Sequence, residues 1–201
     1  MTAVGAPTGK REQTKAANRA ALLRAGAEAF AELGYGAANV RDIVRRTDLA
    51  TGTFYNYFPD KESVLREIMD DVAAQIRTGA RAARRDATDL EGFIAGGFRA
   101  YYEVLAADRR VFALLRRNAG TIRAMFDQPA IFAGYEELEE DLRAARAAGS
   151  LPVLDTKYLT GAMVGAGFEI AVLMLDRDPP DVEGAVAFVT SLFVGGIERL
   201  R

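Results

Sequence analysis

Residues 39–61, NVRDIVRRTDLATGTFYNYFPDK, decide the fold of this 201-residue chain. The stretch divides into a short amphipathic helix, a tight turn, and a second short helix that carries hydroxyl and aromatic side chains. Pro59 lacks a backbone N–H and restricts the residue before it, so the second helix is predicted over Thr51–Phe58. This is the layout of a helix-turn-helix whose second helix enters the major groove of DNA.

The first of these helices has a start signal and an apolar face. Asn39 is placed to cap it, with Asp42 three residues later as in a capping box. Ile43 and Val44 lie on its apolar face. At the turn, Asp48 is expected to adopt a left-handed backbone, which Asp tolerates better than most residues.

The second helix carries side chains suited to reading base edges. Asn56 can form a bidentate pair with adenine, and the hydroxyls of Thr51 and Thr53 can donate or accept. Tyr55 and Tyr57 each join a flat apolar body to a polar tip. An alternative stays open, in which the two tyrosines only pack beside the neighbouring phenylalanines of a small three-helix domain.

The segment TGTFYNYFPDKESVL, residues 51–65, resembles the signature of the tetracycline-repressor-like (TetR) family of regulators. The upstream stretch ALLRAGAEAFAELGYGAANVRDIVRRT resembles the first two helices of that family, so the resemblance covers about residues 16–76. Two positions depart from the family pattern: Asp48 replaces a turn glycine, and Tyr57 replaces a histidine.

The resemblance implies an all-α fold. It consists of an N-terminal three-helix helix-turn-helix DNA-binding domain and a helical-bundle ligand-binding and dimerisation domain, with about nine helices in total. It also implies which residues touch DNA. Thr53 and Tyr55 match positions that contact bases or backbone, Tyr57 and Lys61 match positions that contact phosphate, and Val40 and Arg41 open a helix whose start meets phosphates.

The composition disfavours enzymes and metal sites. The chain has no cysteine and no histidine, which removes disulfides, thiolate chemistry, the commonest general base and the commonest transition-metal ligand. It shows no phosphate-binding glycine loop and no paired-carboxylate motif. The acidic run at residues 136–141 is interpreted as a solvated helix face with arginines nearby. We therefore expect no cofactor and no metal.

The charge is unevenly distributed. Residues 1–61 hold nine Lys and Arg against six Asp and Glu, a net +3, whereas the whole chain carries −2. A basic head on an acidic body suits contact with DNA through one end. From the sequence we expect no apolar run as long as the roughly eighteen residues of a membrane helix. The N-terminus lacks the apolar core of a signal peptide, so a cytoplasmic location is expected.

Three regions are predicted along the chain. Residues 1–14 are interpreted as a disordered basic arm, residues 15–76 as the DNA-binding domain with its motif at 39–58, and residues 77–201 as the ligand-binding and dimerisation domain. A long helix beginning at Lys61 leaves the DNA-binding domain and enters the rest of the chain. No stretch shows the alternation of a strand.

The last two predicted helices, about 155–176 and 181–200, are apolar on two faces. Such helices need both their own core and a second partner. We therefore expect a homodimer through these helices, which matches an operator of two-fold symmetry. The alternative is a thick intramolecular core. In the last helix a continuous seam recurs at spacings of three and four, formed by Val182, Val186, Val189, Phe193, Gly196 and Leu200.

A ligand pocket is expected in the second domain, although aromatic and methionine residues at helical spacing are more often plain core. Glu169, within an apolar run, could face the pocket, the dimer interface or solvent, and needs a partner if it is buried. The candidate contacts are Phe98, Tyr101, Tyr102, Leu105, Phe112, Leu115, Asn118, Met125, Phe126, Phe132, Met163, Phe168 and Glu169.

The sequence thus predicts a dimeric DNA-binding regulator, in the simplest case a repressor released by a small hydrophobic or aromatic molecule. An activator or a ligand-independent repressor with the same head remains open. So does an interaction protein in which the helix-turn-helix only packs. A helical enzyme is disfavoured by the missing histidine and cysteine.

Overall fold

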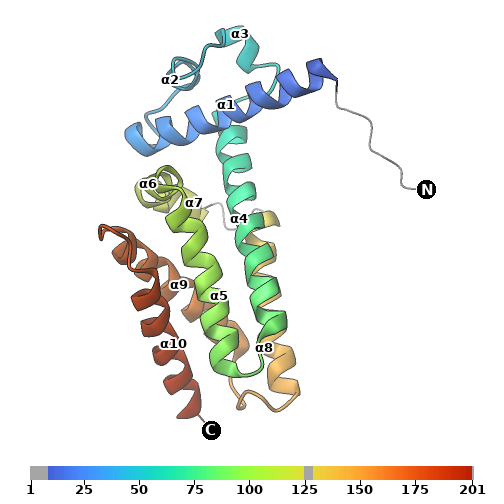
Figure 1. The fold of residues 1–201 in the computed structure, drawn as a ribbon, viewed down its shortest axis with the longest axis vertical. Coiled ribbons are helices and arrows are strands. Elements are labelled where there is room, and N and C mark those ends of the chain that lie inside the picture. The colour runs from blue at the N-terminus through green and yellow to red at the C-terminus, as the bar shows by residue number, and fades with distance from the viewer. Residues whose placement is uncertain (1–8, 125–128, 201) are drawn as a thin grey trace, which may run out of the picture. The chain divides into compact units, whose positions relative to one another are not determined.

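The computed structural model describes residues 9–124 and 129–200, and this part of the chain is built from ten helices and no strands (Figure 1). The all-α prediction is confirmed, with one helix more than expected. The chain divides into two compact units, residues 1–68 and 69–201. The division falls within α4, and the domain boundary expected at residue 76 stays a prediction. The helices are α1 Lys10–Leu33, α2 Val40–Val44, α3 Thr51–Phe54, α4 Lys61–Asp86, α5 Leu90–Ala107, α6 Arg109–Arg117, α7 Ala119–Ala124, α8 Pro129–Ala147, α9 Thr156–Leu175 and α10 Val182–Glu198.

The first helix begins earlier than predicted. α1 starts at Lys10, where the N–H groups of Glu12 and Gln13 donate to the carbonyl of Gly9 at 2.8 and 3.2 Å. The expectation of disorder is therefore wrong for residues 10–14, whereas residues 1–8 lie outside the described part. Side chains of this first turn are exposed, so the turn is an extension of a helix already nucleated further along and not a product of packing.

The first unit has a small aromatic and aliphatic core. Phe30, Ile43 and Phe54 come from three different helices and are each 0% exposed. α1 and α4 approach closely at Gly26, where an added Cβ would lie 2.5 Å from Cγ1 of Val64. Only glycine fits this crossing without displacement of its neighbour.

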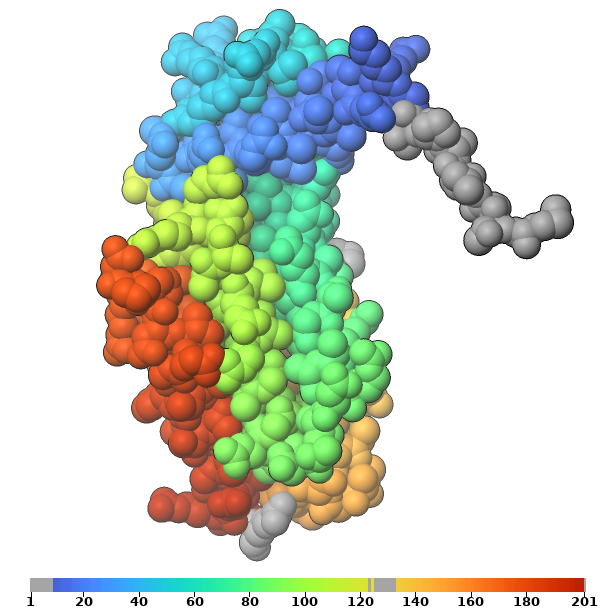
Figure 2. Space-filling view, in the orientation of Figure 1, coloured from blue at the N-terminus to red at the C-terminus, as the bar shows by residue number. Residues whose placement is uncertain are grey.

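The second unit is a helical bundle in which α5 and α10 lie side by side (Figure 1 and Figure 2). Val186, Val189 and Phe193 of α10 are buried, and the ring of Phe193 stacks on Phe98 of α5 at 5.8 Å between centroids. The centre of the apolar seam predicted in the last helix therefore lies in the core of its own chain.

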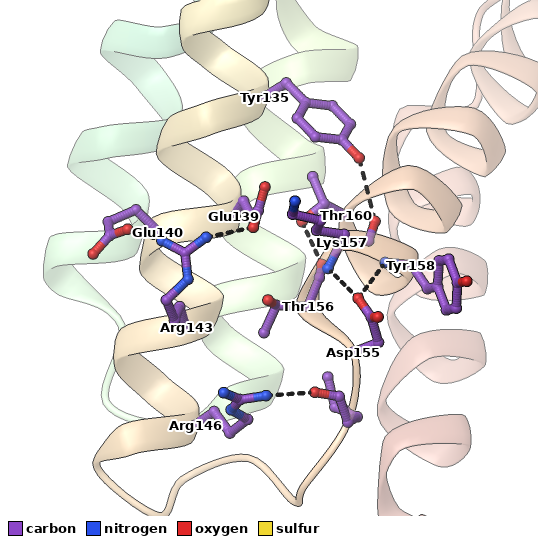
Figure 3. A network of polar contacts seen from close by, with 11 residues as sticks. Tyr135, Glu139, Glu140, Arg143, Arg146, Asp155, Thr156, Lys157, Tyr158 and Thr160 are labelled. Carbon is purple, nitrogen blue, oxygen red and sulfur yellow. Dashed lines mark hydrogen bonds and ion pairs between the residues drawn. The ribbon is translucent and has the colours of Figure 1, made fainter.

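The connection from α8 to α9 is held by polar contacts (Figure 3). Arg146 donates to the carbonyl of Leu154 at 2.9 Å, and the carboxylate of Asp155 accepts from the backbone N–H groups of Lys157 and Tyr158, which caps α9. The Tyr135 hydroxyl donates to the carbonyl of Lys157 at 3.2 Å. Together these bonds fix the start of α9 against α8.

Contrary to expectation, α9 is long and apolar enough to resemble a membrane-spanning segment, with a mean hydropathy of 1.6. Interspersed glycines and alanines, together with Val, Ile, Leu and Met, raise the hydropathy without forming an unbroken run of large side chains. The helix packs against α5, α8 and α10, so a place inside a bundle accounts for the same composition.

Candidate nucleic-acid interface and cavity

The first helix of the helix-turn-helix is capped as predicted. Oδ1 of Asn39 accepts from the N–H groups of Arg41 and Asp42 at 2.9 and 3.2 Å, and Oδ2 of Asp42 accepts from the N–H of Asn39 at 3.0 Å. This reciprocal capping box satisfies backbone donors that a five-residue helix would otherwise leave free.

The turn after α2 is organised by Thr47 and not by Asp48. The Thr47 hydroxyl donates to the carbonyl of Val44 at 2.9 Å and accepts from the N–H of Leu49 at 3.2 Å. Within residues 9–124 and 129–200 no residue other than glycine has a positive φ, so the left-handed backbone expected at Asp48 is wrong. A hydroxyl bridge makes that conformation unnecessary.

The second helix is shorter than predicted and ends at Phe54. After it, the N–H groups of Asn56 and Tyr57 donate to carbonyls three residues earlier, so the chain stays coiled in a tighter turn until Phe58. Phe54 and Phe58 are buried, whereas Tyr55 is 57% exposed and touches Phe54 edge-on. The aromatic residues therefore divide into a packing pair and an outward surface.

The predicted DNA-contacting side chains differ in accessibility. Thr51, Tyr55 and Asn56 are exposed near α3, and Arg41 is exposed on α2. The hydroxyl of Tyr57 accepts from the side-chain amide of Asn18 at 3.1 Å. The half-buried members of the predicted set are Val40, Thr53, Tyr57 and Lys61.

Lys61 is engaged inside the first unit. Its ammonium group donates to the carbonyls of Tyr35 and Ala38 at 2.7 and 2.8 Å and, more weakly, to that of Gly36 at 3.4 Å. It also lies 4.5 Å from the centroid of the Tyr35 ring. Three carbonyls and an aromatic face thus engage the ammonium group within the unit. This structural role depends on backbone atoms, and the sequence did not indicate it; the predicted phosphate contact of Lys61 stays a prediction.

A cavity of about 510 Å³ lies within the second unit, with walls from α4, α5, α8 and α9 and further contacts from α6 and α7. The wall is mostly apolar. Six of the predicted ligand contacts line it: Phe98, Tyr101, Leu105, Leu115, Met163 and Phe168.

Four other predicted contacts are not among the lining residues. Tyr102 is fully buried beside Phe98, and its hydroxyl has no hydrogen-bond partner among the described residues. Phe112 is buried, and Asn118 donates to the carbonyl of Leu114 at 2.8 Å. Glu169 is exposed on α9, away from the lining. Met125, Phe126 and the side chain of Phe132 lie outside the described residues.

The charged lining residues were not identified from the sequence. Arg77 and Arg84 of α4 and Glu137 of α8 join the apolar wall, and Tyr135 lines it as well. The apolar spacing along α4 indicated only a core seam. The arginines lie between these apolar positions, and no local pattern reveals which side of α4 meets α8.

These charges form a cluster between α4 and α8. Arg81 donates through Nε to Glu137 at 2.9 Å, and the hydrogen bonds from Arg81 hold the pKa of Glu137 below its ordinary value against the opposing effect of burial. Nε of Arg84 lies 2.6 Å from a carboxylate oxygen of Asp141 in a contact that is ionic and not a well-directed hydrogen bond. The Arg84 side chain is 12% exposed.

Comparison of the sequence with known families shows what the N-terminal unit is similar to. Residues 22–68 match the model of the family described as bacterial regulatory proteins, tetR family. The HTH-type transcriptional repressor KstR2 of Rhodococcus jostii is 31% identical over 90 residues, which are 43% of this chain and 44% of that relative. The HTH-type transcriptional regulator BetI of Escherichia coli is 37% identical over 59 residues, 29% of this chain and 30% of BetI. These matches thus span less than half of each relative.

Solved structures share the fold over nearly the whole chain. The fatty acid degradation regulator FadR from Bacillus halodurans superposes with a TM-score of 0.77 at 24% identity and covers 98% of this chain and 100% of its own. FadR from Bacillus subtilis, solved in complex with stearoyl-CoA, gives 0.75 at 22% identity, covering 89% and 98%. The ketosteroid regulator KstR2 of Mycobacterium tuberculosis gives 0.67 at 19% identity, covering 90% and 94%.

Proposed function

Since the chain belongs to the TetR family of bacterial regulatory proteins, we propose that it is a repressor that reads a specific operator through α3 and is released by a hydrophobic ligand. The observation that carries the proposal is the outward set Thr51, Tyr55 and Asn56 on a capped and packed helix-turn-helix. Side chains held on a rigid scaffold and open to solvent can reach base edges.

The operator has two-fold symmetry because the repressor is a homodimer. The support is an outer face on α9 and α10, which we define by its large exposed residues Leu173, Phe188 and Leu192 and its small ones Ala162, Ala187 and Gly196. Three large apolar side chains exposed on neighbouring helices favour a protein partner, and small residues between them allow helices to approach closely. Two copies joined here supply the two reading helices.

Release follows from linkage between the cavity and the operator. α4 begins at Lys61, in the helix-turn-helix unit, and lines the cavity from Met69 to Arg84, so one helix belongs to both sites. A ligand that binds better to a conformation unfit for DNA weakens operator binding by the same factor. A coupling of about 1–3 kcal/mol corresponds to roughly 5- to 150-fold. The FadR complex with stearoyl-CoA supports an acyl chain as one class of ligand for this architecture.

Selection of bound duplexes from a random DNA pool tests the proposal. The wild-type protein should enrich a two-fold related motif. Tyr55→Ala should lose that motif, and Tyr55→Phe, which keeps the ring on Phe54 and removes only the hydroxyl, should show altered preference at one position. If no motif is enriched and all binding disappears at raised salt, the chain binds phosphate without reading sequence and the proposal is wrong.

A further inference from the structure

Most of the helices around the cavity pack tightly against one another. Between α4 and α5, an added Cβ at Gly79 would lie 3.0 Å from Cβ of Ala100. Between α5 and α9, an added Cβ at Gly167 would lie 2.9 Å from the buried ring of Phe98. α8 in turn packs along α9. These seams can open only if whole helices separate.

The seam between α4 and α8 is different, because long arginine side chains span it. The atoms nearest to the Cβ position of Gly134 on α8 are Cγ and Cδ of Arg77 on α4, at 3.5 and 3.8 Å. One turn further along, Nε of Arg81 donates to Glu137 at 2.9 Å, and Arg84 lies 3.9 Å from the same carboxylate. Alkyl stems and charged groups therefore occupy this seam, where the other seams have small residues or a buried ring.

The charged side chains of this seam form a row from the cavity to the solvent. Arg84 and Glu137 line the cavity, and their side chains are 12% and 26% exposed. Arg81 and Asp141 are not among the lining residues, and their side chains are 63% and 43% exposed. Glu137 pairs with Arg84 on the inner side and with Arg81 on the outer side. Ion pairs thus separate the cavity from water at this seam.

A partition made of ion pairs opens more easily than a packed seam. Exposed ion pairs contribute little to stability, and surface side chains change rotamer within nanoseconds. The alkyl part of an arginine side chain also offers an apolar surface to a passing ligand. Separation of α4 from α5 would instead break close packing between two helices.

We propose that the α4–α8 seam is the entrance of the cavity and that the ion pair between Arg81 and Glu137 closes it. The inference rests on the proposed ligand binding and specifies how that site is reached and regulated. Because Arg81 is not a lining residue, it controls the rates of entry and exit and not the affinity. Ionic strength then regulates ligand exchange, since salt weakens exposed ion pairs.

Stopped-flow binding of N-phenyl-1-naphthylamine, a neutral dye that fluoresces in apolar sites, tests the inference on the full chain. The chain has no tryptophan, so its own emission does not interfere. Arg81→Met should raise the association and dissociation rate constants by the same factor, roughly 1.5- to fivefold, as expected for the loss of one exposed ion pair. The Kd of the dye should not change. Added salt should accelerate exchange in the wild type and have little effect on Arg81→Met.

Arg85→Met is the matched control. Arg85 has the same charge on the same helix, but it is 77% exposed, is not a lining residue and pairs with the neighbouring Asp86 at 3.8 Å. Its replacement should leave both rate constants unchanged. Gly97→Leu shows that the dye occupies the cavity: Gly97 lines it, and no atom lies within 4 Å of its Cβ position. A leucine there should fill the space and abolish binding.

A covalent bridge across the seam provides the converse experiment. The chain has no cysteine, so Arg81→Cys combined with Glu137→Cys introduces the two thiols that a short bis-maleimide can join. The bridged protein should exchange the dye much more slowly than the wild type. The same double variant capped with N-ethylmaleimide carries similar bulk without a bridge, and it should exchange the dye at least as fast as the wild type.

Rate constants that neither Arg81→Met nor the bridge alters overturn the inference, as does a changed Kd in Arg81→Met with unchanged dissociation. Absence of dye binding by the wild type overturns it as well. Titration of the operator complex with the dye separates this from the proposed function. If the seam controls exchange and DNA remains bound, the inference stands and ligand release is wrong. If the dye releases DNA equally fast from the bridged protein, release stands and the entrance is wrong.

Discussion

At the start of α4, the ammonium group of Lys61 donates hydrogen bonds to the carbonyls of Tyr35 and Ala38 in the connection between α1 and α2. The connection ends at Asn39, the residue that caps α2, so the start of the helix-turn-helix is tied to the first residue of α4. A lysine bonded in this way holds the α1–α2 connection in place, and its N–H donors are engaged within the unit, so we expect it to contribute little to binding of an external anion.

Lys61→Met should therefore destabilise the N-terminal unit by about 1–3 kcal/mol, because part-buried carbonyls lose a charged donor. The slope of operator affinity against salt concentration should remain that of the wild type. In contrast, Arg41→Met, at an exposed side chain of α2, should reduce that slope by about one and leave stability unchanged. A slope reduced equally by both variants would show that Lys61 contacts phosphate.

At this scale the sequence predicted what depends on side chains alone. The capping box at Asn39 and the outward position of Tyr55 follow from residue type and spacing. The contacts of Lys61 and the bridge at Thr47 depend on carbonyl positions, which exist only after the chain has folded. The contact between Arg84 and Glu137 could not be predicted either, since these residues are far apart in the sequence.

At the scale of helices, the crossing of α1 and α4 depends on one missing methyl group. An added Cβ at Gly26 would lie 2.5 Å from Val64 and 3.7 Å from Ile68, both of which are buried. The two helices would have to separate, because Val64 is short and branched and has little freedom to move aside.

Gly26→Ala should lower the free energy of unfolding by about 1–3 kcal/mol through overpacking. Gly52→Ala is the matched control: no atom lies within 4 Å of its Cβ position, and alanine favours a helix by about 1 kcal/mol over glycine. Urea denaturation of both variants measures the effects, which should have opposite signs. A neutral result at Gly26 would mean that the crossing is loose.

Helix existence was predictable because apolar spacing, caps and breakers are local signals. Helix ends were less so: α1 extends to Lys10 and α3 stops at Phe54, in each case through backbone hydrogen bonds that the pattern does not encode. The function of a helix face was least predictable. Apolar residues three or four positions apart occur in both α4 and α10. This spacing is compatible with a face in the core, a cavity wall or a surface for a partner.

At the scale of the whole molecule, the outer face of α9 and α10 tests the proposed dimer. Phe188 and Leu192 are 56% and 51% exposed, so replacing both with Glu should leave the bundle folded and give a monomer with weakened operator binding. Val189→Ala, at a fully buried neighbour, should instead cost stability without changing the mass in solution. Light scattering after size exclusion distinguishes these outcomes. A dimeric double variant would place the interface elsewhere.

Below about pH 8 the response of stability to pH should be confined to the acid range. The chain has no histidine, so no side chain has an ordinary pKa between about 5 and 8. Hydrogen bonds from Ser63 lower the pKa of Asp60, and those from Arg110 lower the pKa of Asp108. A carboxyl group with a lowered pKa in the folded protein stabilises the fold above its pKa in the unfolded chain, near pH 4. This stabilisation is lost as the pH falls through the pKa of the folded state.

Urea midpoints should therefore be constant from about pH 6 to 8 and decrease below about pH 4. A transition near pH 6.5 would contradict this expectation.

The small residues of the outer face have a thermodynamic consequence. Ala162, Ala187 and Gly196 have no side-chain rotamers to lose when another helix covers them. Most of the ordering that accompanies association is then confined to a few large side chains such as Phe188. Two copies can associate here with little loss of side-chain entropy. The fit between the helix backbones, more than the ordering of flexible side chains, would then determine how rigidly the two DNA-binding units are held at a fixed spacing.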